Sequence, residues 1–138
     1  MPRVIPPVPD ADDEPFWRGV AEGRLLLQRC ADCLAMRHPP SPMCRHCHSV
    51  RSEWFEASGR GTVYSWIQSK HPTELDDAPR IVALIDLEEG ARMVSNLQGV
   101  ELDDVRPGML VEVVFMEIDG TVLPQFRPIG TSTVVNEG

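Results

Sequence analysis

The four cysteines of this chain form two closely spaced pairs. Each pair has two residues between its thiols, in Cys30-Ala31-Asp32-Cys33 and in Cys44-Arg45-His46-Cys47. That spacing lets one tight turn point both sulfur atoms at a single ion, and two such turns supply a closed tetrahedral site. The pattern therefore predicts a zinc ribbon, in which a structural Zn2+ ion is bound by Cys30, Cys33, Cys44 and Cys47.

Three other roles for the cysteines compete with this interpretation: two disulfides, a redox Cys-x-x-Cys, and a ribbon that keeps its shape without metal. No apolar signal segment precedes the pairs, which disfavours disulfides. A redox motif normally needs a single pair at a strand–helix junction. A ribbon of about 30 residues buries too little apolar surface to fold alone, so we expect its fold to depend on the metal.

Charge is unevenly distributed along the 138 residues, whose formal net charge is −8. Residues 24–60 contain six arginines and three acidic residues, whereas the chain from residue 61 onward contains five basic and thirteen acidic residues. Phosphate contacts dominate nucleic-acid affinity, so the acidic second half disfavours a nucleic-acid-binding protein. No run approaches the roughly 20 apolar residues that cross a bilayer, and we expect a soluble, cytoplasmic protein without a membrane partner.

The N-terminal region predicts an extended arm followed by a short helix. Residues 1–13 contain four prolines and three aspartates. We expect Asp13 to cap the helix and Gly23 to end it. The apolar face with Phe16 and Trp17 either packs on the core of the chain or docks on another subunit.

The rest of the chain predicts strands. Two strands, at 25–27 and 52–57, flank the cysteine pairs, and the proline-rich segment 38–42 forms the loop between the pairs. Beyond a glycine turn at 58–61, alternating apolar residues and turn signals predict five further strands, at 62–69, 80–87, 91–98, 109–118 and 121–127. Five strands with a long first loop suit a Greek-key barrel of the OB type, although periodicity alone favours an open sandwich nearly as well.

These elements make the fold mainly β: a short N-terminal helix, a zinc ribbon and a C-terminal five-stranded OB-fold barrel. We divide the chain into four parts, which are the arm and helix (1–23), the ribbon (24–58), the barrel (59–130) and a tail (131–138).

The sequence contains no recognisable catalytic set. There is no Gly-x-Ser-x-Gly, every cysteine is assigned to the metal, and four thiolates leave no open position for a reactive water. The pairs of acidic residues fall in arms or turns, where solvated charge is expected. The residues alone therefore predict a non-catalytic binding or scaffolding protein.

The order of motifs along residues 14–130 resembles a known family. The motifs are Leu27-Gln28-Arg29-Cys30-x2-Cys33, Pro39-Pro40, Cys44-x2-Cys47, Ser58-Gly59-x-Gly61-Thr62-Val63-Tyr64-Ser65-Trp66, Val82-Ala83-Leu84-Ile85, Gly108-Met109-x-Val111-x-Val113 and Pro124-x-Phe126-x-Pro128. They are similar to those of the small zinc-ribbon/OB-fold proteins associated with acyl-CoA metabolism, formerly a domain of unknown function. Two positions depart from that family: Leu34 stands where glycine is common and Arg45 where proline is frequent, which questions the loop geometry more than metal binding.

The resemblance implies a rubredoxin-like ribbon and a function within a larger complex. Members of the family associate with thiolase-fold enzymes that act on acyl-CoA thioesters. Some resemble partners of aldolases that shorten steroid side chains by retro-aldol cleavage, and others accompany condensing or acetyl-transferring enzymes. In these complexes the catalytic residues belong to the partner.

We therefore expect a non-catalytic subunit of a lyase (aldolase) or acyltransferase complex, assembled as a heterotetramer with a thiolase-fold protein. Arg37 and Arg45 are the candidates for binding the phosphorylated end of an acyl-CoA. The candidates for binding the partner protein are Phe16, Trp17, Trp54, Tyr64 and Trp66. A nucleic-acid-binding ribbon/OB module, and a free-standing zinc hydrolase or redox protein, are the alternatives from other functional classes.

Overall fold

The computed structural model describes residues 13–69, 80–118 and 120–129. The predicted arm up to residue 12, the predicted long first loop of the barrel at 70–79 and the predicted tail at 131–138 lie outside the described residues. The described elements are α1 (Glu14–Ala21), β1 (Leu26–Cys30), β2 (Met36–Arg37), β3 (Ser52–Glu56), β4 (Arg60–Ser69), β5 (Arg80–Leu87), β6 (Arg92–Leu97), the 3-10 helix η1 (Leu102–Asp104), β7 (Leu110–Ile118) and β8 (Thr121–Pro128). The predicted fold class, mainly β with one short helix, is confirmed.

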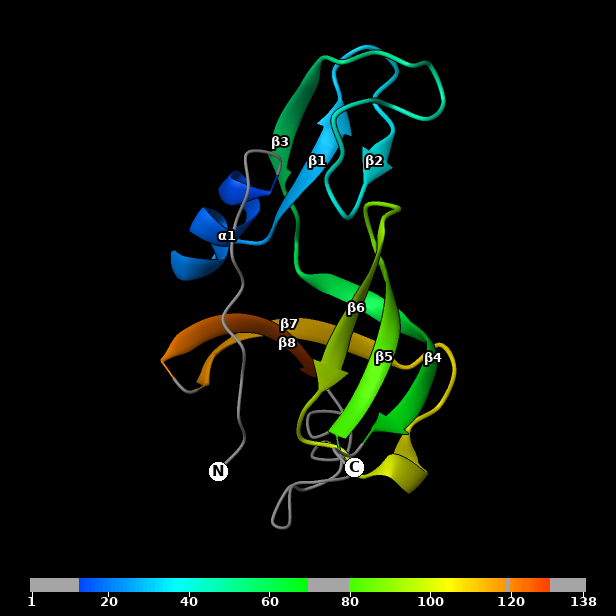
Figure 1. Cartoon of the computed structure of the whole chain (residues 1–138). Coiled ribbons are helices and arrows are strands. Elements are labelled where there is room, and N and C mark those ends of the chain that lie inside the picture. The colour runs from blue at the N-terminus through cyan, green and yellow to red at the C-terminus, as the bar shows by residue number, and fades with distance from the viewer. Residues whose placement is uncertain (1–12, 70–79, 119, 130–138) are drawn as a thin grey trace.

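The ribbon is built on a three-stranded antiparallel sheet with β1 in its centre. The β1–β3 ladder runs from Leu26↔Glu56 to Cys30↔Ser52, and β2 pairs with the other edge of β1. The two-residue strand β2 was not among the predicted strands, because two residues carry no readable periodicity. Figure 1 shows this sheet standing above the barrel, with α1 beside its base.

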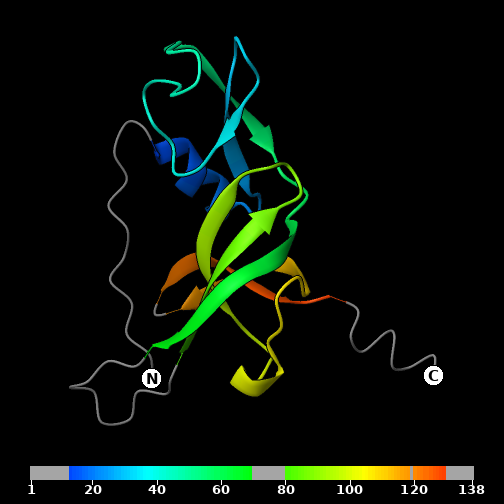
Figure 2. The same ribbon diagram turned by 90° about the vertical axis from the view of Figure 1, so that its right-hand side faces the viewer.

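The second sheet is a closed barrel with strand order β4-β5-β6-β8-β7. The β4–β7 pairing, which includes Gly61↔Val111, closes it. This order is that of an OB fold, so the closed barrel is correct and the open sandwich is wrong. The β6–β8 seam is parallel and has a single paired position, Leu97↔Phe126. The strands wrap around a common axis in both views (Figures 1 and 2).

The predicted barrel strands differ from the observed ones by at most two residues at either end. The β7–β8 hairpin is paired up to Ile118↔Thr121, and Gly120 has a φ of +82° as a tight hairpin turn requires; its neighbour Asp119 lies outside the described residues. The segment after β6, expected to be an irregular break, contains η1. The two sheets separate between β3 and β4, and the division into 24–58 and 59–130 remains a prediction.

A single apolar core joins the helix, the ribbon base and the barrel. Phe16 and Val20 of α1 and Leu25 and Leu27 at the start of the ribbon are buried in the same cluster as the inward-facing barrel residues, which are Val63, Ile81, Ala83, Ile85, Leu87, Met93, Leu97, Val111 and Phe126. The alternation expected for barrel strands is visible in β5, where every second residue is buried. The ribbon base is therefore fixed to the barrel by shared burial.

The start of α1 differs from its prediction in one respect. Asp13 occupies the N-cap position, but its side chain makes no capping hydrogen bond. Gly23 follows the helix with a φ of +77°, as expected of a glycine stop. The eight-residue α1 is too short to cross a membrane, and the described parts contain no helix that is long and apolar enough to do so.

Candidate metal centre and its surroundings

The four cysteine sulfurs converge on one point at the end of the ribbon. All four Sγ atoms lie within 4.8 Å of one another. The Sγ–Sγ distance is 3.5 Å for Cys30–Cys47 and 3.6 Å for Cys33–Cys44. A tetrahedron with Zn–S bonds of about 2.3 Å places its sulfurs about 3.8 Å apart, whereas a disulfide requires about 2.05 Å. The cysteines are free, and their geometry fits Zn2+.

Two turns with the same backbone geometry present the sulfurs. In one, the N–H of Leu34 donates to the carbonyl of Cys30 at 2.9 Å; in the other, the N–H of His48 donates to the carbonyl of Cys44 at 2.8 Å. Leu34 and His48 both adopt a left-handed backbone, with φ of 67° and 65°. Leu34 thus takes the conformation that a glycine would favour at this position, so its departure from the family pattern leaves the turn intact.

Backbone N–H groups favour the thiolate form at the two buried cysteines. The N–H of Cys33 donates to Cys30 Sγ at 3.4 Å and helps lower the pKa of Cys30 to about 6. The N–H groups of Cys47 and His46 likewise lower the pKa of Cys44. The Ser49 N–H favours a thiolate at Cys47, but the neighbouring cysteines outweigh it and raise the pKa of Cys47 to about 12. Four thiolates this close therefore need a bound cation to be charged together.

The site has the character of a structural centre. Cys30 and Cys44 are buried and Cys33 and Cys47 are exposed, so the ion would lie at the surface end of the ribbon with every ligand position filled by sulfur. His46, within the second pair, is exposed and is not part of the cluster of possible ligands in the described chain. When bound, zinc would hold the two turns together and would offer no open position to a substrate.

A buried glutamine, which the sequence analysis did not single out, holds the proline-rich loop against the ribbon sheet. Gln28 Oε1 accepts hydrogen bonds from Arg37 Nε at 2.5 Å and from the Ser41 N–H at 2.8 Å. Its Nε2 donates to Ser52 Oγ at 3.3 Å. Its position inside the Leu-Gln-Arg-Cys motif was the available signal, but only the folded chain shows that its amide links β1, β2 and β3.

The structure separates the ribbon arginines into two groups. Four of those in residues 24–60 form ion pairs, which are Arg24–Glu56, Arg29–Glu53, Arg51–Asp32 and Arg60–Glu88. Arg37 instead donates to the neutral oxygens of Gln28 and Ser41, and its buried Nη1 has no hydrogen-bond partner among the described residues. Arg45 is exposed and forms no ion pair within the described chain. The two predicted anion-binding arginines are therefore the two without a carboxylate partner.

The five predicted partner-binding aromatic residues differ in accessibility. Phe16 is buried in the core of the chain and presents no surface to a partner, because the helix turns it inward against the edge of Trp17. Trp17, Trp54 and Trp66 are half-buried. Tyr64 is 54% exposed on the outer face of β4, with the Arg92 guanidinium 3.8 Å from its ring centroid. Partner binding by the four accessible residues remains a prediction.

Family models match both parts of the chain. Residues 17–50 match the model described as "ChsH2, rubredoxin-like zinc ribbon domain", and residues 54–116 match "ChsH2, C-terminal OB-fold domain". A chain in the solved structure of the Ltp2-ChsH2(DUF35) aldolase is 40% identical, with a TM-score of 0.81, and the match covers 88% of this chain and 98% of that one. The four clustered cysteines are thus those of a rubredoxin-like zinc ribbon.

Curated relatives extend the comparison. A probable enoyl-CoA hydratase alpha subunit of Thermomonospora curvata is 43% identical over 92% of this chain, and the 3-oxo-4,17-pregnadiene-20-carboxyl-CoA hydratase alpha subunit of Mycobacterium tuberculosis is 35% identical over 91%. This chain spans only 41% and 40% of the length of these two relatives. A DUF35 domain-containing scaffold protein of Methanocaldococcus jannaschii is 33% identical, and the match covers 82% of this chain and 88% of that protein.

Proposed function

This chain belongs to the DUF35 family and carries both ChsH2-type domains, and from that membership we propose that it is the non-catalytic accessory subunit of a thiolase-fold acyl-CoA enzyme. The observation that carries the proposal is the 40% identity over nearly the full length of a chain in the Ltp2-ChsH2(DUF35) aldolase. The description of the archaeal relative as a scaffold protein also supports a role in assembly.

The proposed reaction of the complex is the retro-aldol cleavage of a steroid side-chain acyl-CoA. The aldolase in the related structure supports the reaction class, and the pregnadiene carboxyl-CoA in the name of the mycobacterial relative supports the substrate class. The closed thiolate cluster offers no position for substrate, so the groups that make and break bonds belong to the partner. A condensing or acetyl-transferring thiolase-like partner is the second candidate, since scaffolding does not depend on the reaction.

Within this complex, Arg37 and Arg45 are proposed to bind the phosphates of the acyl-CoA. The amide of Gln28 and the carbonyl of Ser41 hold the Arg37 guanidinium in place, and no ion pair within the described chain neutralises its charge. Hydrogen bonds to charged groups contribute about 1.5–3 kcal/mol each. The proposed partner surface comprises the accessible aromatic residues Trp17, Trp54, Tyr64 and Trp66.

The assembly is tested by co-expressing this chain with a thiolase-fold protein encoded beside it. We expect the two to co-purify as a heterotetramer, and we expect retro-aldol activity only in the complex. Full activity of the partner purified without this chain would overturn the proposal.

The phosphate contacts are tested in the same complex with Arg37→Met and Arg45→Met. Each is expected to weaken acyl-CoA binding roughly 10- to 100-fold, from the energy of one charge-assisted hydrogen bond. Arg51→Met is the matched control, because Arg51 is already paired with Asp32 at 2.8 Å. Equal losses in all three variants would contradict specific phosphate contacts.

A further inference from the structure

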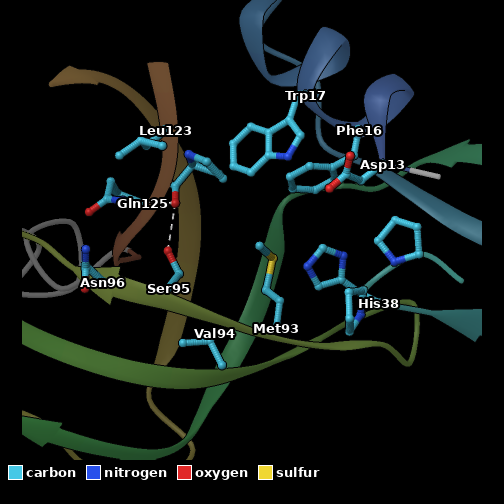
Figure 3. Close-up of a pocket in the computed structure, with 13 residues that line it drawn as sticks. Asp13, Phe16, Trp17, His38, Met93, Val94, Ser95, Asn96, Leu123 and Gln125 are labelled. Atoms are coloured by element: carbon cyan, nitrogen blue, oxygen red, sulfur yellow. Dashed lines mark hydrogen bonds between the residues drawn. The ribbon is translucent and has the colours of Figure 1, made fainter. Parts of the chain in front are cut away.

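A cavity of about 360 Å3 lies where the helix, the ribbon loop and the barrel meet. Its walls come from α1, from the loop residues 38–40, and from parts of β6 and β8. Figure 3 shows the side chains of Trp17, Met93 and Leu123 around this space. None of the predicted functional sites accounts for it, apart from the inclusion of Phe16 and Trp17 among the predicted partner contacts.

The topology of the barrel explains why the space is there. The β6–β8 seam is paired only at Leu97↔Phe126, which is reinforced by the Gln98 N–H donating to the Phe126 carbonyl at 2.7 Å. The segments 93–96 and 123–125 precede this point and line the cavity instead of pairing with each other. The cavity therefore forms where the seam opens, beneath the aromatic face of α1.

The walls are mostly apolar and rigidly held. Phe16 is buried, and its ring lies nearly perpendicular to that of Trp17 and tilted against that of His38, each with ring centroids 5.0 Å apart. Met93 and Leu123 supply aliphatic surface from the two strands. An apolar cavity of this size lies at the lower end of the range for small-molecule sites, so it can take one compact ring system but not a whole acyl-CoA.

Some polar groups in the walls already form hydrogen bonds within the chain, and others do not. The Ser95 hydroxyl donates to the Pro124 carbonyl at 2.7 Å, and Gln125 Oε1 accepts from Gln98 Nε2 at 3.0 Å. The Nδ1 of His38 has no hydrogen-bond partner in the described chain, but it is fully enclosed, so a ligand in the cavity does not reach it. Asn96 also makes no side-chain hydrogen bond to a described residue, so its amide can donate to a ligand oxygen.

The charge of the cavity selects against anions. Burial lowers the pKa of His38 below its usual value, so its imidazole is neutral at pH 7. Among the described lining residues no arginine or lysine is present, and Asp13 is acidic. We therefore expect no phosphate to bind in this space. The proposed phosphate-binding residues, Arg37 and Arg45, are not among those that line it.

We propose that this cavity binds an uncharged, mostly apolar group bearing a carbonyl oxygen, with Asn96 as its hydrogen-bonding residue. The identity of the bound group rests on the proposed function: if the substrate of the complex is a steroid acyl-CoA, the group is the ketone-bearing ring end of the steroid. Trp17 covers the rings, and the accessory subunit thereby contributes to substrate selection as well as to assembly.

The test uses the zinc-loaded full chain, labelled with 15N, and the neutral diketone androst-4-ene-3,17-dione as the probe. Titration is expected to shift the indole N–H of Trp17 and the side-chain amide of Asn96 in a saturable manner. Coenzyme A, the anionic comparison, is expected to leave these two resonances unshifted. No shift up to the solubility limit of the probe would overturn the proposal.

Two variants make the test specific to the cavity. Leu123→Trp fills the space, and Asn96→Leu removes the donor without adding bulk; each is expected to weaken probe binding at least tenfold. Ile67→Ala, at a site 63% exposed on β4, is the control and should bind as the unmodified chain does. Unchanged affinity in Asn96→Leu, or in a Leu123→Trp that retains zinc and dispersed spectra, would refute the assignment. Because no partner is present, failure here leaves the co-purification test of the proposed function unaffected.

Discussion

Replacing Cys44 by serine removes one buried sulfur from the metal centre and tests whether zinc holds the ribbon in its functional shape. Structural zinc sites in zinc-finger peptides contribute about 10–16 kcal/mol at pH 7. If the four thiolates share this energy about equally, losing one costs about 2.5–4 kcal/mol, or roughly 60- to 700-fold in zinc affinity. The Cys44 sulfur accepts a hydrogen bond from the His46 N–H within the second turn, so the loss falls directly on that turn.

The expected structural damage is local. Leu25 and Leu27 are buried in the core shared with the barrel, and the β1–β3 ladder joins them to the rest of the ribbon sheet. We therefore expect the segments 30–34 and 44–49 to lose their structure while the barrel stays folded. Competition with a chromogenic zinc chelator measures the affinity, amide spectra report the two regions separately, and co-purification reports partner binding, which is expected to be lost.

Met43→Ser is the matched control for Cys44→Ser, because Met43 is the neighbouring residue and is 49% exposed. It is expected to keep the zinc affinity and the partner. Zinc affinity and complex formation in Cys44→Ser equal to those of the unmodified chain would refute the reasoning that zinc is architectural.

Three further predictions concern the metal and the barrel. Acidification should release zinc, because protons compete for the thiolates. Backbone N–H groups lower the pKa of Cys30 and of Cys44, so these two should resist protonation longest; a chelator assay measures the release, and full retention at pH 4 would contradict this. Phe126→Ala should lower the free energy of unfolding in urea by about 3–5 kcal/mol, because Phe126 is fully buried at the parallel seam, and a loss below 1 kcal/mol would be inconsistent with that position. Gly61→Ala should lower the free energy of unfolding by about 1–3 kcal/mol, because the added Cβ would lie 2.5 Å from the Asp86 carbonyl oxygen. Thermal unfolding measures this loss, and Thr62→Ala is the neighbouring control, for which a smaller loss is expected.

Several elements could be predicted because their signals are local in the sequence. The spacing within Cys30-x2-Cys33 and Cys44-x2-Cys47 sets the geometry of two turns, and the metal chemistry follows from the residue type. Period-two alternation and glycine turns located the barrel strands to within two residues. By contrast, the two-residue strand β2 and the helix η1 are too short to show a period and were missed.

The features of the site that the sequence analysis mispredicted or missed depend on contacts between residues far apart in the chain. Phe16 and Trp17 are adjacent in an apolar helix, but which one faces inward depends on how α1 packs on the barrel, and the structure buries Phe16. The other arginines of the ribbon pair with carboxylates, whereas Arg37 and Arg45 do not. These ion pairs join residues up to 32 positions apart, so local sequence patterns do not reveal them. The central role of Gln28 likewise depends on three strands meeting.

The amino-acid sequence by itself determined the zinc ligands and the strand content, because these depend on residue type and short spacing. The tertiary structure alone decided that the barrel closes, which ribbon arginines lack a carboxylate partner, and that a mostly apolar cavity opens beside Trp17. These features arise where the helix, ribbon and barrel bring distant residues together, and the energy of such contacts appears only once the chain has folded.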